Sequence, residues 1–288
     1  MTSDDGSIRL GDGRRLAYRE YGARGGQPLF YFHGWPGSRL DFVTNDAAAA
    51  GAGVRVIAVD RPGMGGSDPL PRRRVLDWPA DVAALADALA IERFAVLGFS
   101  FGGPFARACA YAMPERVTLA VLVSAVGPLD DPAAGARLLP RPLRLGLALA
   151  GLSPALALPF VWLTAREARA GHLARDVAHM MPAADTAVFG EAEVADAMSA
   201  SAVECFRGGL QGAVADAAAV ARGEGFRLED IATEVQIWHG ELDQSDPIAM
   251  ARSQERRIPR ARAHYVEGGG HLILFSHAAE IMAGVRGP

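Results

Sequence analysis

Short apolar runs alternate with amphipathic segments along much of this chain. Residues 28–32 and 54–59 are nearly continuous apolar runs, which are typical of strands buried on both faces of a parallel sheet. Residues 81–90 repeat apolar side chains at helical spacing, and further apolar runs follow at 94–97 and 117–126. The alternation predicts a doubly wound α/β sheet, in which ligands bind beyond the carboxyl ends of the strands.

The same pattern indicates how the chain is organised. Alternating apolar residues on either side of the turn at 11–13 predict an N-terminal β-hairpin. After residue 127 the alternation stops, and Ala-rich segments broken by Pro predict helices. It then resumes with two strands and two helices, at 235–239, 247–257, 263–266 and 271–283. We therefore expect one core formed by residues 1–127 and 226–288, with a helical cap inserted at 128–225.

The strongest chemical signal is the sequence GFSFGG at residues 98–103, because a predicted strand ends and a predicted helix begins there. A nucleophile in such a sharp turn needs small residues two positions before and two after it. Gly98 and Gly102 meet this requirement and identify Ser100 as the candidate nucleophile. The alternative is a serine in a plain Gly-rich turn.

A second loop, HGWPGS at residues 33–38, follows another predicted strand. Main-chain N–H groups from this loop and from the residue after the nucleophile can bind the oxyanion of a tetrahedral intermediate. Trp35 and Phe101 are the predicted donors. We interpret His33 as a residue that packs the loop rather than as a catalyst.

Two later strand ends supply an acid and a base. The strand at 235–238 leads into HGELD, which places Asp243 in the following turn, and the strand at 263–266 leads into EGGGH, which ends at His271. The chain order nucleophile, acid, base is one that this kind of fold uses. We predict a triad of Ser100, Asp243 and His271.

Other carboxylates near these strand ends were assigned different roles. Asp246 precedes Pro247, so we interpret it as the N-cap of the helix that Pro247 opens. Asp130 or Asp131, after the preceding strand, is the alternative acid of the triad.

Composition narrows the function further. The net charge of -4 and pI near 6.0 provide no basic stripe for a phosphate backbone, so nucleic acid is not an expected partner. All 29 basic residues are Arg, which excludes lysine Schiff-base chemistry. Cys109 and Cys205 make neither a disulfide framework nor a metal site, and we expect buried, reduced thiols. The histidines show no metal-ligand spacing, so neither a metal nor a cofactor is predicted.

Two further features bear on location. Residues 145–165 carry no charge over a length that could cross a bilayer, but Pro154 and Pro159 interrupt them, so we predict short helices and no membrane span. The polar first ten residues do not resemble a secretory signal, which makes the cytoplasm the default location. The partner expected is a small-molecule substrate; a homodimer is compatible with the sequence, which leaves the oligomeric state open.

Four ordered motifs carry a resemblance to a known family. The runs YFHGWPGSR at 31–39, DRPGMGGSD at 60–68, GFSFGGP at 98–104 and GGGH at 268–271 resemble the α/β-hydrolase superfamily, near its esterase-like and proline-iminopeptidase-like branches. The resemblance implies a mostly parallel eight-stranded sheet with helices on both faces and an inserted cap. It also implies that the loop at 60–68 shapes the floor of the site rather than reacts.

The expected activity is hydrolysis of a small or medium, largely apolar carboxylic ester through an acyl-enzyme. Four residues are expected to line an apolar pocket: Met64, Phe99, Phe160 and Trp162. The alternatives are a proline-iminopeptidase-like peptidase, a biosynthetic tailoring enzyme and a slow ligand-sensing receptor. A peptidase would need a cap carboxylate to hold a substrate ammonium group, for which the candidates are Glu191, Glu193 and Glu204.

Overall fold

The structure is a computed structural model that describes residues 4–131, 134–171 and 182–285. Its centre is an eight-stranded sheet in the order β1-β2-β4-β3-β5-β6-β7-β8. The strands are β1 (Asp4–Arg9), β2 (Arg15–Gly22), β3 (Gln27–Phe32), β4 (Val54–Val59), β5 (Phe94–Phe99), β6 (Val117–Val123), β7 (Val235–Gly240) and β8 (Ala261–Val266). β2 pairs antiparallel with β1 and β4, and all other pairs are parallel, which confirms the predicted mostly parallel sheet.

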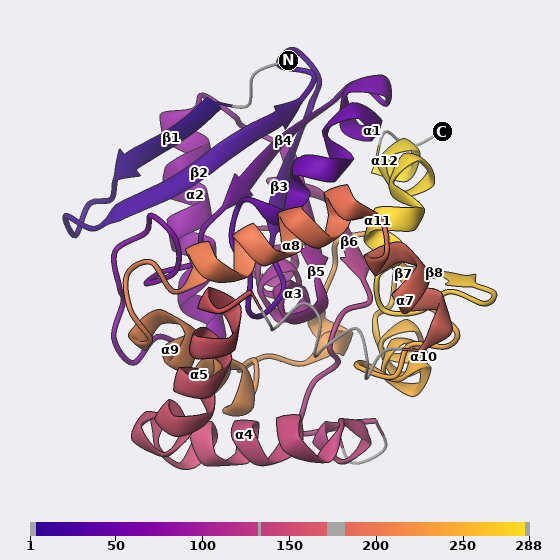
Figure 1. The fold of residues 1–288 in the computed structure, drawn as a ribbon. Coiled ribbons are helices and arrows are strands. Elements are labelled where there is room, and N and C mark those ends of the chain that lie inside the picture. Colours follow the sequence, from indigo (N-terminus) through magenta and orange to yellow (C-terminus); the bar gives the residue numbers. More distant parts are fainter. Residues whose placement is uncertain (1–3, 132–133, 172–181, 286–288) are drawn as a thin grey trace.

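Helices pack on both faces of this sheet (Figure 1). Many of them belong to the part of the chain between β6 and β7. They are α1 (Asp46–Gly51), α2 (Trp78–Ala88), α3 (Gly103–Ala112), α4 (Arg141–Leu152), α5 (Pro154–Arg169), α7 (Ala183–Phe189), α8 (Ala192–Cys205), α9 (Gln211–Ala221), α10 (Ile248–Arg257), α11 (Ile273–Ser276) and α12 (Ala278–Val285). The N-terminal hairpin and the predicted alternation of strands and helices are therefore confirmed.

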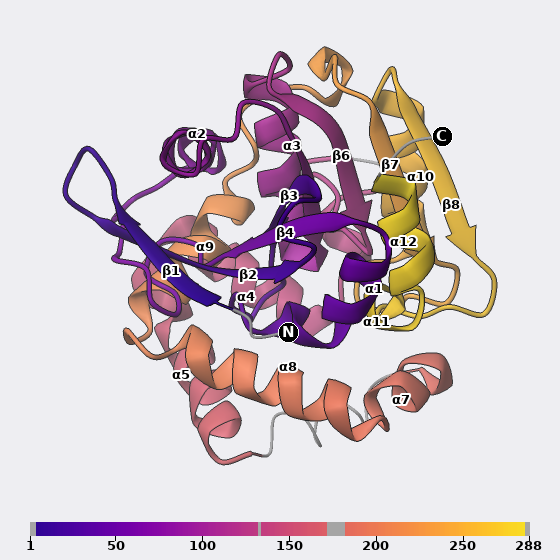
Figure 2. The same ribbon diagram turned by 90° about the horizontal axis from the view of Figure 1, so that it is seen from above.

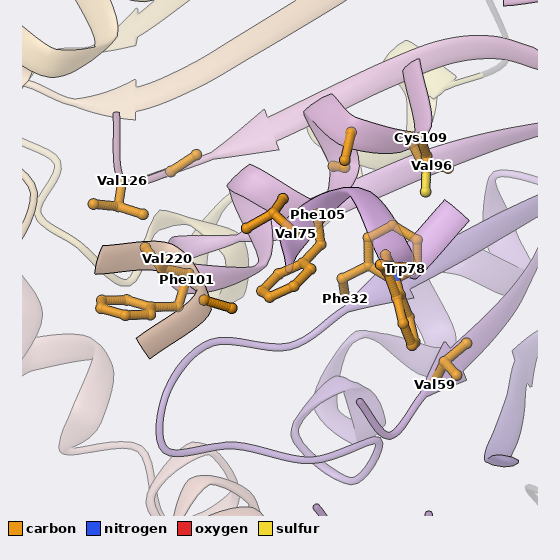
Figure 3. Close-up of a cluster of buried hydrophobic side chains, with 14 of the residues drawn as sticks. Phe32, Val59, Val75, Trp78, Val96, Phe101, Phe105, Cys109, Val126 and Val220 are labelled. Atoms are coloured by element: carbon orange, nitrogen blue, oxygen red, sulfur yellow. The ribbon is translucent and has the colours of Figure 1, made fainter. Parts of the chain in front are cut away.

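The strands bury apolar side chains on both faces, as their continuous apolar runs predict. In β3, Leu29 and Tyr31 belong to one buried cluster, and Phe30 and Phe32 to the other. Because successive side chains of a strand point to opposite faces, the two clusters are the two sides of the sheet. Figure 3 shows part of the larger cluster, in which Trp78 packs edge-on against Phe32 with ring centroids 5.3 Å apart.

Helices α4 to α9 occupy the sequence interval in which the alternation stops. α4 packs against α5 and α9, and α5 packs against α8. Seen from above, α5, α8 and α7 lie together on one side of the sheet (Figure 2). The expected cap at 128–225 includes residues 132–133 and 172–181, which lie outside the described residues, and its boundaries stay a prediction.

Several element ends differ from the sequence expectation. The strand expected at 117–126 ends at Val123, and the helix expected at 271–283 is divided into α11 and α12. Ser153 separates α4 from α5 within the uncharged stretch.

In the part of the chain that the structure describes, we find no helix with the length and apolar character needed to span a membrane. Cys109 and Cys205 are buried and unbonded, as expected.

Candidate active site

Ser100 lies in a strained turn between β5 and α3. Its φ is 52°, in the left-handed region that side chains other than glycine rarely adopt. A Cβ at Gly98 would come within 2.5 Å of the Gly102 carbonyl oxygen, and a Cβ at Gly102 would collide with the carbonyl oxygen of Phe32. The two glycines thus allow strand and helix to approach each other, as GFSFGG predicts.

Asp243 and His271 meet at the same edge of the sheet. His271 follows β8 and points Nδ1 at Asp243 Oδ2, 2.9 Å away, while the other Asp243 oxygen accepts N–H bonds of 2.9 Å from Ser245 and Asp246. Burial alone would raise the pKa of Asp243, but the charge and hydrogen bond of His271 outweigh it, so this pKa lies below its usual value. Asp243 is therefore held as a carboxylate that orients the imidazole.

The surroundings of His271 raise the pKa of its imidazole. Burial lowers its pKa, whereas the charge and hydrogen bond of Asp243 and then the charge of Asp246 raise it, with a net increase to about 9. The ring also lies beside Phe99, with centroids 5.3 Å apart. The imidazole of His271 is thus held close to the Asp243 carboxylate and the Phe99 ring.

Asp246 is not the N-cap that the sequence suggested. Pro247 occupies the N-cap position of α10, which begins one residue later than expected, and no side chain caps the helix. The Asp246 side chain is 2% exposed, and its Oδ2 lies 3.5 Å from Ser100 Oγ and 3.9 Å from His271 Nδ1. Among the hydrogen bonds of the described residues, this is the one that the Ser100 hydroxyl makes, and none joins it to His271.

The loop after β3 is fixed by buried hydrogen bonds. His33 Nδ1–H donates to the Gly34 carbonyl at 2.8 Å, and Nε2 accepts the Arg61 N–H at 3.3 Å, which assigns the tautomer. Burial and then the Arg61 charge hold the His33 pKa well below its usual value, so the ring is neutral. The Arg61 guanidinium also donates to the carbonyls of His33 and Gly34. His33 therefore packs the loop, as predicted.

The two predicted oxyanion residues come from two loops, one after β3 and one after β5. The rings of Trp35 and Phe101 are neighbours, with centroids 6.3 Å apart. The indole N–H of Trp35 donates to the Ala213 carbonyl at 3.2 Å, but no hydrogen bond between described residues uses its main-chain N–H. Phe101 lies in the first turn of a short 3₁₀ helix, Ser100–Gly102, where main-chain N–H groups lack intrahelical partners. Both N–H groups are thus available, and their role stays a prediction.

A cavity of about 230 Å³ opens at the Ser100 turn. Its described lining is mostly apolar and comprises Gly34, Trp35, Pro36, Asp41, Phe99, Ser100, Phe101, Leu143, Ala168, Gly171, Phe189, Met198, Ser199, Ser201, Ala202, Ser245, Asp246, His271 and Leu272. Residues from the core and from the helices after β6 therefore share one cavity.

The four predicted pocket residues divide into three groups. Phe99 lines the main cavity, and Phe160 lines a small neighbouring void and stacks on Trp35 at 6.1 Å. Met64 is wrong as a pocket residue, because it is fully buried in the larger hydrophobic cluster of the core and does not line the cavity. Trp162 is also wrong: α5 turns it outward, and it is 54% exposed.

Most of the other acidic candidates do not reach the cavity. Glu191 and Glu193 are exposed, and Glu204 pairs with Arg39 at 2.8 Å. The alternative acid Asp131 instead accepts a hydrogen bond from Ser253 at 2.6 Å. Among the described residues, none of these four lines the cavity.

Within the loop at 60–68, Asp60 is buried and accepts hydrogen bonds from the Arg39 N–H and the Gly66 N–H, at 2.7 and 2.8 Å. This arrangement agrees with the structural role implied by the resemblance.

Two carboxylates that line the cavity were missed as site residues. Asp41 opens a 3₁₀ turn, Asp41–Asn45, and burial raises its pKa to about 8. Asp246 lines the cavity as well, although its position before Pro247 predicts an N-cap. A signal was present, since Asp246 lies three residues after Asp243 in the same turn beyond a buried strand.

Comparisons with known proteins identify the family of this chain. A sequence model of the alpha/beta hydrolase fold matches residues 27–278, and the chain belongs to this family. A non-heme chloroperoxidase from Streptomyces lividans is 42% identical over 126 residues, which are 43% of this chain and 46% of that protein. A bifunctional esterase/perhydrolase from Acinetobacter calcoaceticus is 34% identical over 126 residues, with the same two shares. Each match therefore spans less than half of the curated relative.

Solved structures resemble the whole chain. A thermophilic esterase from Thermogutta terrifontis superposes with a TM-score of 0.72 at 20% identity, covering 98% of this chain and 97% of that chain. At this identity the likeness establishes the fold, which is the α/β-hydrolase fold that the motifs implied.

Proposed function

We propose that this protein is a serine hydrolase that cleaves small or medium, largely apolar carboxylic esters through an acyl-enzyme. The observation that carries the proposal is the convergence of Ser100, on its strained turn, with the His271–Asp243 pair at one cavity. Three groups from three different strand ends serve no evident packing purpose there. They do match the nucleophile, base and orienting acid of acyl transfer.

The reaction begins with a proton transfer. A turn of the Ser100 side chain about its Cα–Cβ bond brings Oγ from Asp246 towards His271, which takes the hydroxyl proton as Oγ attacks the ester carbon. The resulting imidazolium is stabilised by Asp243. It returns the proton to the departing alkoxide, which leaves as an alcohol, and the acyl group remains on Ser100.

Deacylation repeats these steps with water. His271 takes a proton from water, the hydroxide equivalent attacks the acyl carbon, and the proton returns to Ser100 Oγ as the acid leaves. In both halves the oxyanion would accept hydrogen bonds from the main-chain N–H groups of Trp35 and Phe101. In a well-studied hydrolase, one such donor stabilises the transition state by about 3 to 4 kcal/mol.

The cavity argues for the substrate class. Its lining includes Phe99, Phe101 and Phe189, and His271 is the one basic side chain among the described lining residues. Two carboxylates, Asp41 and Asp246, also line it, so a polyanionic substrate would gain little counter-charge there. A volume of about 230 Å³ suits an acyl group of modest size. The esterase-type relatives in the comparisons support the same class.

The test is turnover of p-nitrophenyl esters of increasing acyl length by wild type and Ser100→Ala. We expect wild type to prefer short to medium acyl chains and the variant to lose activity about a million-fold. Equal turnover by the variant, or no turnover of any ester by wild type, would reject the proposal.

A peptidase is less well supported. It would need a carboxylate to hold the substrate ammonium, and the cap glutamates that could do so do not line the cavity. Prolyl naphthylamides in the same assay separate the two activities. Faster cleavage of the amide than of every ester would favour the peptidase.

A further inference from the structure

The candidate site contains a second carboxylate that the triad does not use. Asp246 Oδ2 is near both Ser100 Oγ, at 3.5 Å, and His271 Nδ1, at 3.9 Å. Its Oδ1 is buried and has no hydrogen-bond partner among the described residues. A buried carboxylate with one unpaired oxygen costs free energy, so a role other than packing is expected.

The fold does not need this side chain for the turn itself. The main chain of Asp246 is already held, because its N–H donates to Asp243 Oδ1 at 2.9 Å and its carbonyl accepts Nε2–H of His239 at 2.7 Å. The side chain caps no helix. Its contacts are therefore with the groups of the proposed reaction.

The charges around Asp246 come from several elements. Asp243 shares its loop, His271 follows β8, His239 ends β7, Arg107 comes from α3 and Asp185 from α7. Arg107 is already paired with Glu224 and with Gln254. Asp185 accepts the Leu272 N–H at 2.7 Å. Among the residues that the structure describes, the cation left to Asp246 at close range is the protonated imidazole of His271, at 3.9 Å.

We propose that Asp246 is a positioning residue of the hydrolase: its side-chain oxygen holds the Ser100 hydroxyl, and its charge favours imidazolium at His271, so that loss of the charge lets His271 act as a free base at lower pH. This inference rests on the proposed function. It adds a restraint on the nucleophile and a charge beside the base to a site that would otherwise contain a simple triad.

The ionisation of the pair agrees with this geometry. Burial raises the pKa of Asp246 to about 7, with further repulsion from Asp243 and an opposing effect of His271. The negative charge of Asp246 in turn raises the pKa of His271. Because the two groups titrate together, removing the Asp246 charge must let His271 lose its proton at lower pH.

The experiment measures the rate of Ser100 labelling by a fluorophosphonate from about pH 5 to about pH 10. The rate should rise as His271 becomes a free base. In Asp246→Asn, which keeps the shape but not the charge, we expect the midpoint of that rise to fall by about 1 pH unit. In Asp131→Asn, a matched buried carboxylate away from the cavity, it should not move.

A second variant separates the charge from the hydrogen bond. Asp246→Val removes both and frees the hydroxyl, so we expect the same shift and an alkaline plateau about threefold higher than in Asp246→Asn. It also serves if the asparagine variant does not fold, which circular dichroism checks. A midpoint unchanged in both variants, or a uniform fall in rate at every pH, would overturn the inference and indicate a purely structural role.

The proposed hydrolase activity and the proposed role of Asp246 can be rejected separately. If wild type is not labelled, or Ser100→Ala is labelled equally, the hydrolase proposal itself falls. If labelling occurs at Ser100 and the midpoint does not move, only the role of Asp246 is lost.

Discussion

Buried charge occurs in two regions of this molecule, and the two regions treat it differently. Between the loop after β4 and α9, Asp216 is fully buried and pairs with Arg61 at 2.8 Å and Arg73 at 2.6 Å. At the Ser100 turn, Asp246 is equally buried but keeps one oxygen unpaired. The first arrangement ties a core loop to a helix, and the second leaves an ionisable group facing reacting atoms. Both oxygens of Asp216 are paired, so we infer that full pairing distinguishes the structural carboxylate from the functional one.

The largest effect should follow loss of the proposed base. His271→Ala is expected to lower kcat for ester hydrolysis about a million-fold, because no other group of the described site could take the Ser100 proton as effectively. The melting temperature should change by only a few degrees. Steady-state kinetics measures kcat, and thermal unfolding measures the melting temperature. Retained activity in His271→Ala would show that His271 is not the base.

Loss of the orienting acid should be the next largest effect. Asp243→Asn removes the acceptor at Nδ1 and should lower kcat about ten-thousand-fold through the wrong tautomer. Asp131→Asn tests the alternative acid and is expected to keep near-normal kcat, since its side chain bonds Ser253 instead. A larger loss of kcat in Asp131→Asn than in Asp243→Asn would show that Asp131, not Asp243, is the acid.

In the structural region around Asp216, we expect a substitution to lower the free energy of unfolding rather than the activity. Asp216→Ala leaves two buried guanidinium groups uncompensated and should lower the free energy of unfolding by about 3 to 5 kcal/mol. Asp87→Ala, which breaks an exposed pair with Arg116, should cost less than about 1 kcal/mol. Urea denaturation measures both, and similar values for the two variants would contradict the comparison.

The smallest effects on catalysis are expected for the two misassigned pocket residues, Met64 and Trp162. Met64→Ala creates a core cavity and should cost about 2 to 5 kcal/mol of stability. Trp162→Ala removes an exposed ring and should change stability by less than about 1 kcal/mol. Neither should alter the preference for acyl length, and an altered preference in Trp162→Ala would show that this ring contacts substrate.

The sheet and the acid–base pair were predictable because local sequence determines them. A run such as VRVIAV at Val54–Val59 is apolar at both alternating sets of positions, so burial on both faces follows from the run alone. Parallel strands share one carboxyl edge. Asp243 and His271, which follow neighbouring strands, therefore had to lie close together.

The remaining features depend on contacts that no local pattern contains. A helix start one residue earlier would have made Asp246 a cap; the observed start, after Pro247, places it at Ser100 instead. Whether Met64 or Trp162 faces core, cavity or solvent depends on how distant segments pack. Such differences of one residue or one helix face are resolved by tertiary structure.

The most direct test of the central claim is the site of covalent labelling. After reaction with a fluorophosphonate, peptide mass spectrometry of the wild-type protein should locate one adduct at Ser100. The adduct should be absent in Ser100→Ala and form far more slowly in His271→Ala. An adduct on another residue, or equal labelling rates with and without the imidazole, would contradict the convergence of these side chains into one catalytic unit.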